Sequence, residues 1–312
     1  MSRLEQLLDS GRRVVTAELP IRDGASAAVV ERPLAELAPL VDAVGVTDNA
    51  GAHAHASSVA VASLVQRAGV EPIMNIACRD RNRLALQADL LGAAMHGIEN
   101  VLCISGDDVT AGDEPGTRRV FDLDSPQLLS LAGTLGAGTF LSGRPIDPAP
   151  DFFLGAVENP TAPPYEYRAE RVAKKIRAGA RFFLLQVVFE IEPLAAFLER
   201  VAALGLVERA HFLPSICIVR SPGQLRYLHE HIAGVSVPYR LIAEAEAIAA
   251  TDRSTWLLDR AAALAEDALA LPGVDGLHLI PLGGPELVGR LLERLDPDLR
   301  KEQDGHRSRV EV

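Results

Sequence analysis

The strongest constraint on the fold is a repeated order of short apolar runs and helical segments along the 312 residues. The runs are apolar throughout rather than alternating, which predicts strands buried on both faces, as in a parallel sheet. They lie at Val14–Glu18, Ala43–Asp48, Pro72–Ala77, Asn100–Ser105, Phe152–Val157, Arg181–Val188, Ala210–Ile218 and Gly276–Pro281. Segments with helical spacing between them include Ser57–Arg67, Arg83–Met95, Arg168–Ala178, Pro193–Leu204 and Pro222–His231.

Eight units of strand then helix favour a closed (β/α)8 barrel over an open sheet. A doubly wound Rossmann-like fold would carry G-x-G-x-x-G directly after its first strand, and that motif is absent there. The cluster Gly133–Gly138 has another spacing and is interpreted as a loop. We therefore predict an α/β protein with one (β/α)8 TIM barrel over residues 1–295 and a polar, disordered tail over 296–312. Two additions are expected, an extended loop at 107–124 after the fourth strand and extra helix within 237–271 before the eighth.

Charge and cysteine content exclude several classes of protein. A net charge of −11 argues against an extended nucleic-acid surface. The sequence has neither an apolar signal core near its start nor an 18-residue apolar segment, so we expect no secretion and no membrane span. Cys78, Cys103 and Cys217 lie in or beside apolar runs, which is typical of reduced, buried thiols in a cytoplasmic protein. His53 and His55 have no third ligand nearby in sequence, and no metal site is predicted.

Three polar residues stand at or just past the carboxyl ends of predicted strands, where a (β/α)8 barrel builds its active site. Glu18 ends the first run, and burial there would raise its pKa and suit it to general acid catalysis. The alternative is a glutamate at the end of a strand that pairs with an arginine. Asp107 follows a Ser-Gly turn whose backbone N–H groups can approach a ligand, although an ordinary turn has the same composition. Gln186 interrupts an apolar run, and a buried amide needs hydrogen-bond partners that a polar ligand can supply. Together they indicate an enzyme.

Other charged residues have plainer interpretations. Arg79, Asp80 and Arg81 are expected to form a surface ion-pair cluster of little energetic value. His278, within the eighth run, is expected to be a hydrogen-bonded core histidine. The pair Lys174 and Lys175 fits a solvated helix face, or a phosphate site if it lies at the barrel rim.

Several segments together resemble the methylenetetrahydrofolate reductase family, in its bacterial branch with a C-R-D-R-N segment after strand three. They run from about Val14 to Pro285 and include Asn75–Gly92, Gly97–Asp107, Val120–Ser125, Val46–Asn49, Asn159–Pro164 and Ala173–Ala180. The resemblance implies a barrel that binds FAD at its carboxyl face and reduces 5,10-methylenetetrahydrofolate to 5-methyltetrahydrofolate with NADH or NADPH. Such an enzyme serves one-carbon metabolism and methionine biosynthesis.

The resemblance also implies roles for individual residues. Glu18 matches the acid that helps to open the methylene bridge, and Asp107 matches the aspartate between flavin and pterin. Gln186 and Gln224 match the amides that bind folate. Matching positions for FAD are Thr47, Asn75, Ser105, Gly106, Asp107, Phe121, Asp122, Val157, Arg168, Arg171, Lys174 and Lys175.

The flavin and folate walls depart from the usual family pattern at Leu19–Arg22, Ala77, Val157, Glu190 and Gly283–Gly284. These departures leave three alternatives. Hydride transfer can occur directly from NADH without flavin, or the barrel can serve methyl transfer or demethylation, or it can bind folate as a subunit without reductase activity. Nucleotide preference, folate form, reaction direction and homo-oligomer formation are not fixed by the sequence.

Overall fold

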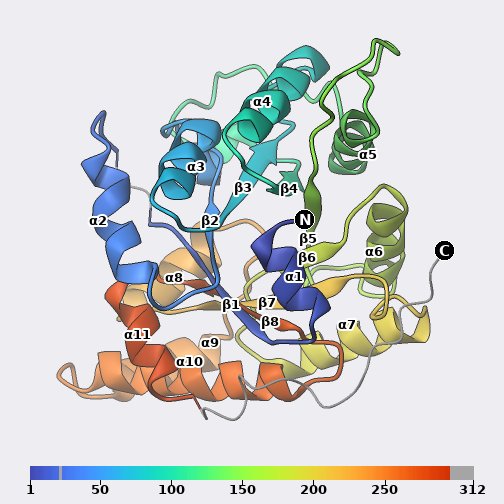
Figure 1. The fold of residues 1–312 in the computed structure, drawn as a ribbon. Helices are drawn as coiled ribbons and strands as arrows, with labels where there is room; N and C mark the ends of the chain where they lie inside the picture. The colour runs from blue at the N-terminus through green and yellow to red at the C-terminus, as the bar shows by residue number, and fades with distance from the viewer. Residues whose placement is uncertain (21–22, 296–312) are drawn as a thin grey trace.

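The computed structural model describes residues 1–20 and 23–295 (Figure 1). Its eight parallel strands close into a barrel in sequence order, β1 pairing with β8, which confirms the predicted (β/α)8 fold. The strands are β1 (Val14–Glu18), β2 (Ala43–Val46), β3 (Pro72–Ala77), β4 (Asn100–Ile104), β5 (Phe153–Glu158), β6 (Phe182–Leu185), β7 (His211–Cys217) and β8 (Gly276–Ile280). The tail predicted over 296–312 lies outside the described residues.

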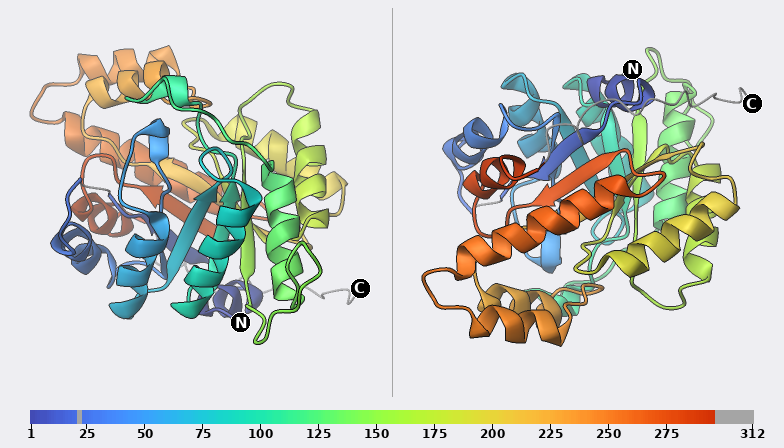
Figure 2. Two further views of the ribbon diagram at one scale, coloured as in Figure 1. Left: turned by 90° about the horizontal axis from the view of Figure 1, so that it is seen from above. Right: turned by 90° about the horizontal axis from the view of Figure 1, so that it is seen from below.

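Helices surround the strands, as the views from above and below show (Figure 2). They are α1 (Arg3–Asp9), α2 (Ala28–Leu37), α3 (Ser58–Arg67), α4 (Arg83–Met95), α5 (Ser125–Gly136), α6 (Tyr167–Arg177), α7 (Ile191–Ala203), α8 (Pro222–His231), α9 (Tyr239–Ala247), α10 (Arg253–Ala270) and α11 (Glu286–Leu292). Short 3-10 turns, η1 (Ala50–Ala52) and η2 (Val109–Ala111), follow β2 and β4. Helices α9 and α10 form the extra helical segment predicted before β8.

Strand residues alternate between two apolar environments because successive side chains point to opposite faces. On β1, Val15 and Ala17 belong to the large core between strands and helices, whereas Val14 packs inside the barrel. The interior cluster also contains Phe153, Phe182 and, from α1, Leu4 and Leu8. Helix α1 therefore closes the end of the barrel at which the strands begin (Figure 1).

The loop after β4 is the second predicted addition. It contains η2 and ends at Asp124, whose carboxylate accepts the Gln127 N–H while the Gln127 side chain accepts the Asp124 N–H. This reciprocal cap fixes the start of α5. The helix runs through Gly133 and ends at Gly136, so the interpretation of Gly133–Gly138 as a loop was wrong for its first four residues. Within the described part of the chain, no helix is both long and apolar enough to cross a membrane.

Candidate active site

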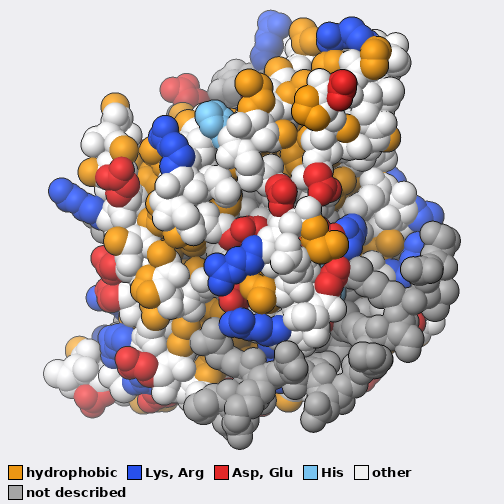
Figure 3. All heavy atoms as spheres, in the orientation of Figure 1, with side chains coloured by type: hydrophobic (Ala, Val, Ile, Leu, Met, Phe, Trp, Pro, Cys, Tyr) orange, Lys and Arg blue, Asp and Glu red, His pale blue; other side chains and the backbone are white. Residues whose placement is uncertain are grey.

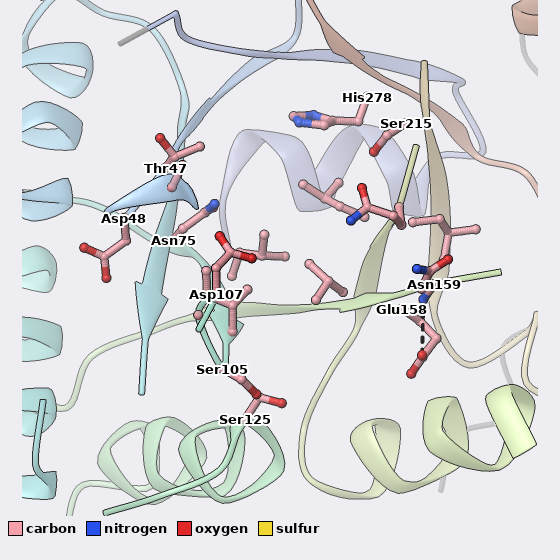
Figure 4. A pocket seen from close by; sticks show the side chains of 18 of the residues that line it. Thr47, Asp48, Asn75, Ser105, Asp107, Ser125, Glu158, Asn159, Ser215 and His278 are labelled. Atoms are coloured by element: carbon pink, nitrogen blue, oxygen red, sulfur yellow. Dashed lines mark hydrogen bonds between the residues drawn. The ribbon is translucent and has the colours of Figure 1, made fainter. Parts of the chain in front are cut away.

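The lumen of the barrel becomes polar toward the carboxyl ends of the strands. A cavity of about 390 Å³ opens there. Six of its polar lining residues come from different strands or strand ends, namely Glu18, Thr47, Asn75, Gln186, Ser215 and His278. Figure 4 labels four of them, Thr47, Asn75, Ser215 and His278. Apolar side chains such as Leu102, Ile104 and Leu184 lie between them. This composition, apolar walls with a few convergent polar groups, is typical of a ligand site.

Glu18 is the last residue of β1 and lines this cavity. It lies two residues after Thr16, so both side chains point into the barrel. Burial raises the pKa of Glu18 to about 7. The described residues give it no ion pair, so the strand-end Glu–Arg pair considered from the sequence is not seen in this part of the chain. A carboxyl group that still holds its proton near neutral pH is suited to donate it.

His278 lies on the neighbouring strand, β8, and lines the same cavity as Glu18, although the sequence analysis expected only a core histidine. Its Nδ1 is 2.9 Å from Oγ1 of Thr16, its register partner on β1. Burial lowers the pKa of His278 to about 4, so the ring is neutral at neutral pH. The expected hydrogen bond is present, but the residue also lines the cavity. Alternate residues of a strand face the same side, so the spacing of Gly276, His278 and Ile280 could have placed His278 inside the barrel.

Two adjacent aspartates after β4 have different surroundings. Asp107 lines the cavity, and its Oδ2 accepts a hydrogen bond from the Gly51 N–H at 2.9 Å. Asp108 instead binds Arg119 at 2.6 Å and caps Thr110 at the start of η2. Only the first carboxylate therefore lies where a ligand in the cavity can contact it.

The Arg79–Arg81 segment corrects the expectation of a surface ion-pair cluster. Arg79 is 2% exposed and among the largest fully buried side chains. Arg81 binds Asp48 at 2.6 Å and Asp89 at 2.7 Å. The prediction was wrong because loops after β2 and β4, distant in sequence, cover these charges.

A buried carboxylate, Glu158 at the end of β5, organises the cations of α6. Lys175 lies 2.9 Å, Arg168 3.1 Å and Arg171 3.1 Å from its oxygens. Burial alone would raise the pKa of Glu158, but the nearby positive charges, Lys175 first, outweigh it and the pKa is lowered. Burial lowers the pKa of Lys175, but Arg168 and Arg171 alone outnumber the single carboxylate, so this wall of the cavity has net positive charge. The sequence analysis did not identify Glu158, because an acidic residue at a strand end does not by itself reveal its partners.

Lys174 and Lys175 separate in the structure. Lys175 is 4% exposed and binds Glu158, whereas Lys174 points to Asp124 at 3.7 Å with an exposed side chain. Consecutive residues on a helix cannot face the same neighbour. Only Lys175 of this pair lines the cavity.

Two buried polar atoms at the cavity have no hydrogen-bond partner among the described residues. They are Oγ1 of Thr47 and Oδ1 of Asn75. A buried oxygen without a partner is costly, so both atoms favour a ligand that donates hydrogen bonds there.

The remaining predicted site residues divide into two groups. Ser105, Gly106, Val157 and Gln186 line the cavity. Residues outside the lining are Lys174, Phe121, Asp122, which binds Arg83, and Gln224, whose amide contacts the Arg220 N–H and the Leu282 carbonyl. Their roles in binding stay predictions.

Comparisons with known proteins identify the family and the fold. Residues 3–296 match the family described as methylenetetrahydrofolate reductase. A solved structure described as an uncharacterized protein from Clostridium thermocellum that binds two copies of 5-methyl-5,6,7,8-tetrahydrofolic acid is 13% identical, with a TM-score of 0.64. The match covers 96% of this chain and 99% of that one, and it shows a shared fold. Tryptophan synthase from M. tuberculosis, in its aminoacrylate-bound form, is 14% identical over 96% of both chains; its TM-score of 0.47 supports no argument.

Proposed function

The chain belongs to the methylenetetrahydrofolate reductase family, as the sequence resemblance implied, and from this premise we propose that it reduces 5,10-methylenetetrahydrofolate to 5-methyltetrahydrofolate. The hydride comes from NADH or NADPH. The Clostridium thermocellum protein of the same fold, described as binding 5-methyltetrahydrofolate, supports a folate ligand for this barrel.

The observation that carries the proposal is the buried carboxyl group of Glu18 in the cavity, whose pKa burial raises to about 7. Opening the methylene bridge breaks the bond between the bridging carbon and N10 of the folate, and N10 must gain a proton as the bond breaks. Glu18 holds such a proton near pH 7 because burial disfavours its charged form. The carbon, left double-bonded to N5 as a cation, then takes the hydride and becomes the methyl group.

Asp107 and Gln186 suit the recognition of the pterin ring. The ring presents N–H donors on its aminopyrimidine edge, which match a carboxylate that faces the cavity. Asp107 keeps acceptor capacity for this purpose, because the Gly51 N–H engages only its Oδ2. Gln186 accepts the Val187 N–H through Oε1, which leaves the two donors of its NH₂ group for a ligand.

The cavity also has features that fit FAD, the carrier that the family implies. FAD, when bound, supplies hydride transfer between the nicotinamide and the folate. Thr47 and Asn75 offer buried oxygens without partners, and the α6 wall has net positive charge suited to a diphosphate. The residues that would hold FAD are Thr47, Asn75, Ser105, Gly106, Asp107, Val157, Arg168, Arg171 and Lys175.

Glu158 favours a second candidate, in which NADH transfers its hydride directly to the folate. The carboxylate already binds Lys175, Arg168 and Arg171, so a diphosphate at this wall must compete with it for the same donors. Competition of this kind weakens the binding of a permanently held dinucleotide such as FAD, whereas NADH, which binds and leaves in every turnover, needs no tight binding.

The visible spectrum of the purified protein, followed by NADH oxidation assays with methylenetetrahydrofolate, tests both candidates. Flavin absorption together with folate-dependent oxidation supports the first. A colourless protein that oxidises NADH only when folate is present supports the second. Folate binding without oxidation of NADH or NADPH, with and without added FAD, would refute both and leave a folate-binding subunit.

A further inference from the structure

Arg79 is a buried arginine just past the end of β3, and its guanidinium joins three loops of the active-site rim. Nε and Nη2 each donate to the Asp80 carboxylate at 2.7 Å. Nη1 donates to the backbone carbonyl of Asp107 at 3.0 Å, and Nη2 also donates to the carbonyl of Asn49 at 3.2 Å. The guanidinium therefore makes four hydrogen bonds with its five N–H groups.

The two backbone segments that Arg79 holds are also the segments that place the Asp107 carboxylate. Its Oδ2 accepts the Gly51 N–H, which lies two residues after Asn49. Gly106, just before Asp107, has φ +87°, and a Cβ there would lie 3.0 Å from the Cβ of Arg79. The chain thus turns tightly over the arginine in a conformation that glycine adopts without strain. The positions of both segments depend on the same side chain.

We propose that Arg79 is a positioning residue, which fixes the Asp107 carboxylate in the folate site by holding the loops after β2 and β4 together. This inference rests on the proposed function, because it takes Asp107 to contact folate. Lysine cannot replace arginine here, since its single ammonium nitrogen does not present the planar fork that reaches Asp80, Asn49 and Asp107 at once. Asp80 neutralises the buried charge of Arg79 and orients its guanidinium, so Asp80 takes part in the same positioning.

A double-mutant cycle on folate binding tests the proposal. Calorimetric titration with 5-methyltetrahydrofolate is carried out on the parent, Arg79→Lys, Asp107→Asn and the double variant. We expect Arg79→Lys to lower the affinity about tenfold, the range for losing a charge-assisted hydrogen bond. In the Asp107→Asn background the same change should have an effect of no more than about twofold, because the two residues act as one unit. Independent, additive losses would overturn the proposal.

Arg81→Lys is the matched control. Arg81 belongs to the same segment and also binds carboxylates, but Asp48 and Asp89 rather than the Asp107 loop. Any loss that it causes should add to that of Asp107→Asn. Should Arg79→Lys fail to fold, Asp80→Asn loosens the guanidinium while keeping it, and it should show the same non-additivity with Asp107→Asn. Additivity in that cycle also overturns the proposal.

Amide hydrogen exchange at Gly51 separates this inference from the proposed function. If the parent binds no folate, the proposed function fails, but the Gly51 N–H still reports whether Arg79 holds the Asp107 carboxylate. We expect Arg79→Lys and Asp107→Asn each to speed its exchange, with no further increase in the double variant. Unchanged exchange in Arg79→Lys would show that Asp107 is placed without Arg79.

Discussion

Replacement of Glu18 by Gln tests the buried acid through stability, independently of any reaction. The pKa of this group rises from 4.5 to about 7 on folding because burial penalises its charge. At about 1.4 kcal/mol for each pH unit, the difference is worth about 3 kcal/mol. Below pH 4.5 both folded and unfolded states hold the proton. As pH rises from there to 7, only the unfolded state loses it, so the parent loses about 3 kcal/mol of stability.

Urea unfolding of the parent and Glu18→Gln at about pH 5 and about pH 8.5 measures this difference. The parent should lose about 2–3 kcal/mol relative to the variant between the two conditions, because glutamine does not ionise. Glu114→Gln, at an exposed position in the loop after β4, serves as the control for a generic charge change. A stability difference between parent and Glu18→Gln that stays constant with pH would refute the raised pKa and, with it, the main support for Glu18 as an acid.

Enzymatic activity gives a second test of the Glu18→Gln variant. Methylenetetrahydrofolate-dependent NADH oxidation should fall about 10²–10⁴-fold in Glu18→Gln, the usual value of general acid catalysis. In the parent, kcat/KM should decline as pH rises through about 7, because the ionised form has no proton to give. Turnover within about threefold of the parent would show that the proton comes from elsewhere.

Three further outcomes follow from the described contacts. Asp107→Asn should lower folate turnover at least about tenfold more than Asp108→Asn, because only Asp107 lines the cavity; equal losses in steady-state assays would indicate that the turn itself matters. Glu158→Gln should lower the free energy of unfolding by about 3–5 kcal/mol, since buried Lys175 loses its carboxylate partner, and a change below about 1 kcal/mol in urea titration would contradict this. Asn75→Leu should weaken 5-methyltetrahydrofolate or dinucleotide binding by about 1–3 kcal/mol in calorimetry without comparable loss of stability, because Oδ1 has no described protein partner.

The fold was predictable because barrel strands leave a local signal. Each is buried on both faces and therefore reads as a continuous apolar run. The ends of these runs were less predictable, because apolar residues continue past the last strand pairing. The run Arg181–Val188 contains the shorter β6, and Val187 and Val188 pack as buried residues beyond it.

The site was predictable only where position along a strand fixes direction. Glu18 could be placed in the cavity because it ends β1, and Gln186 because it follows β6. Arg79 binds Asp107, 28 positions away, and Glu158 binds Lys175, 17 positions away, and no local pattern shows these contacts. The two buried oxygens of Thr47 and Asn75 likewise become visible only when the neighbouring strands are in place.

Burial shifts the pKa values of Glu18 and His278 in opposite directions. Both shifts suit the proposed reaction, in which the substrate becomes a cation. Burial raises the pKa of the acid to about 7 and lowers that of the imidazole to about 4, so both groups are uncharged between these values. Proton transfer from Glu18 to the folate would leave a carboxylate beside the cation that forms on the substrate. A protonated His278 in the same cavity would partly cancel the charge of that carboxylate and repel the cation. The apolar interior below them, which contains Phe153 and Phe182 and is closed by α1, adds to the burial that shifts both pKa values.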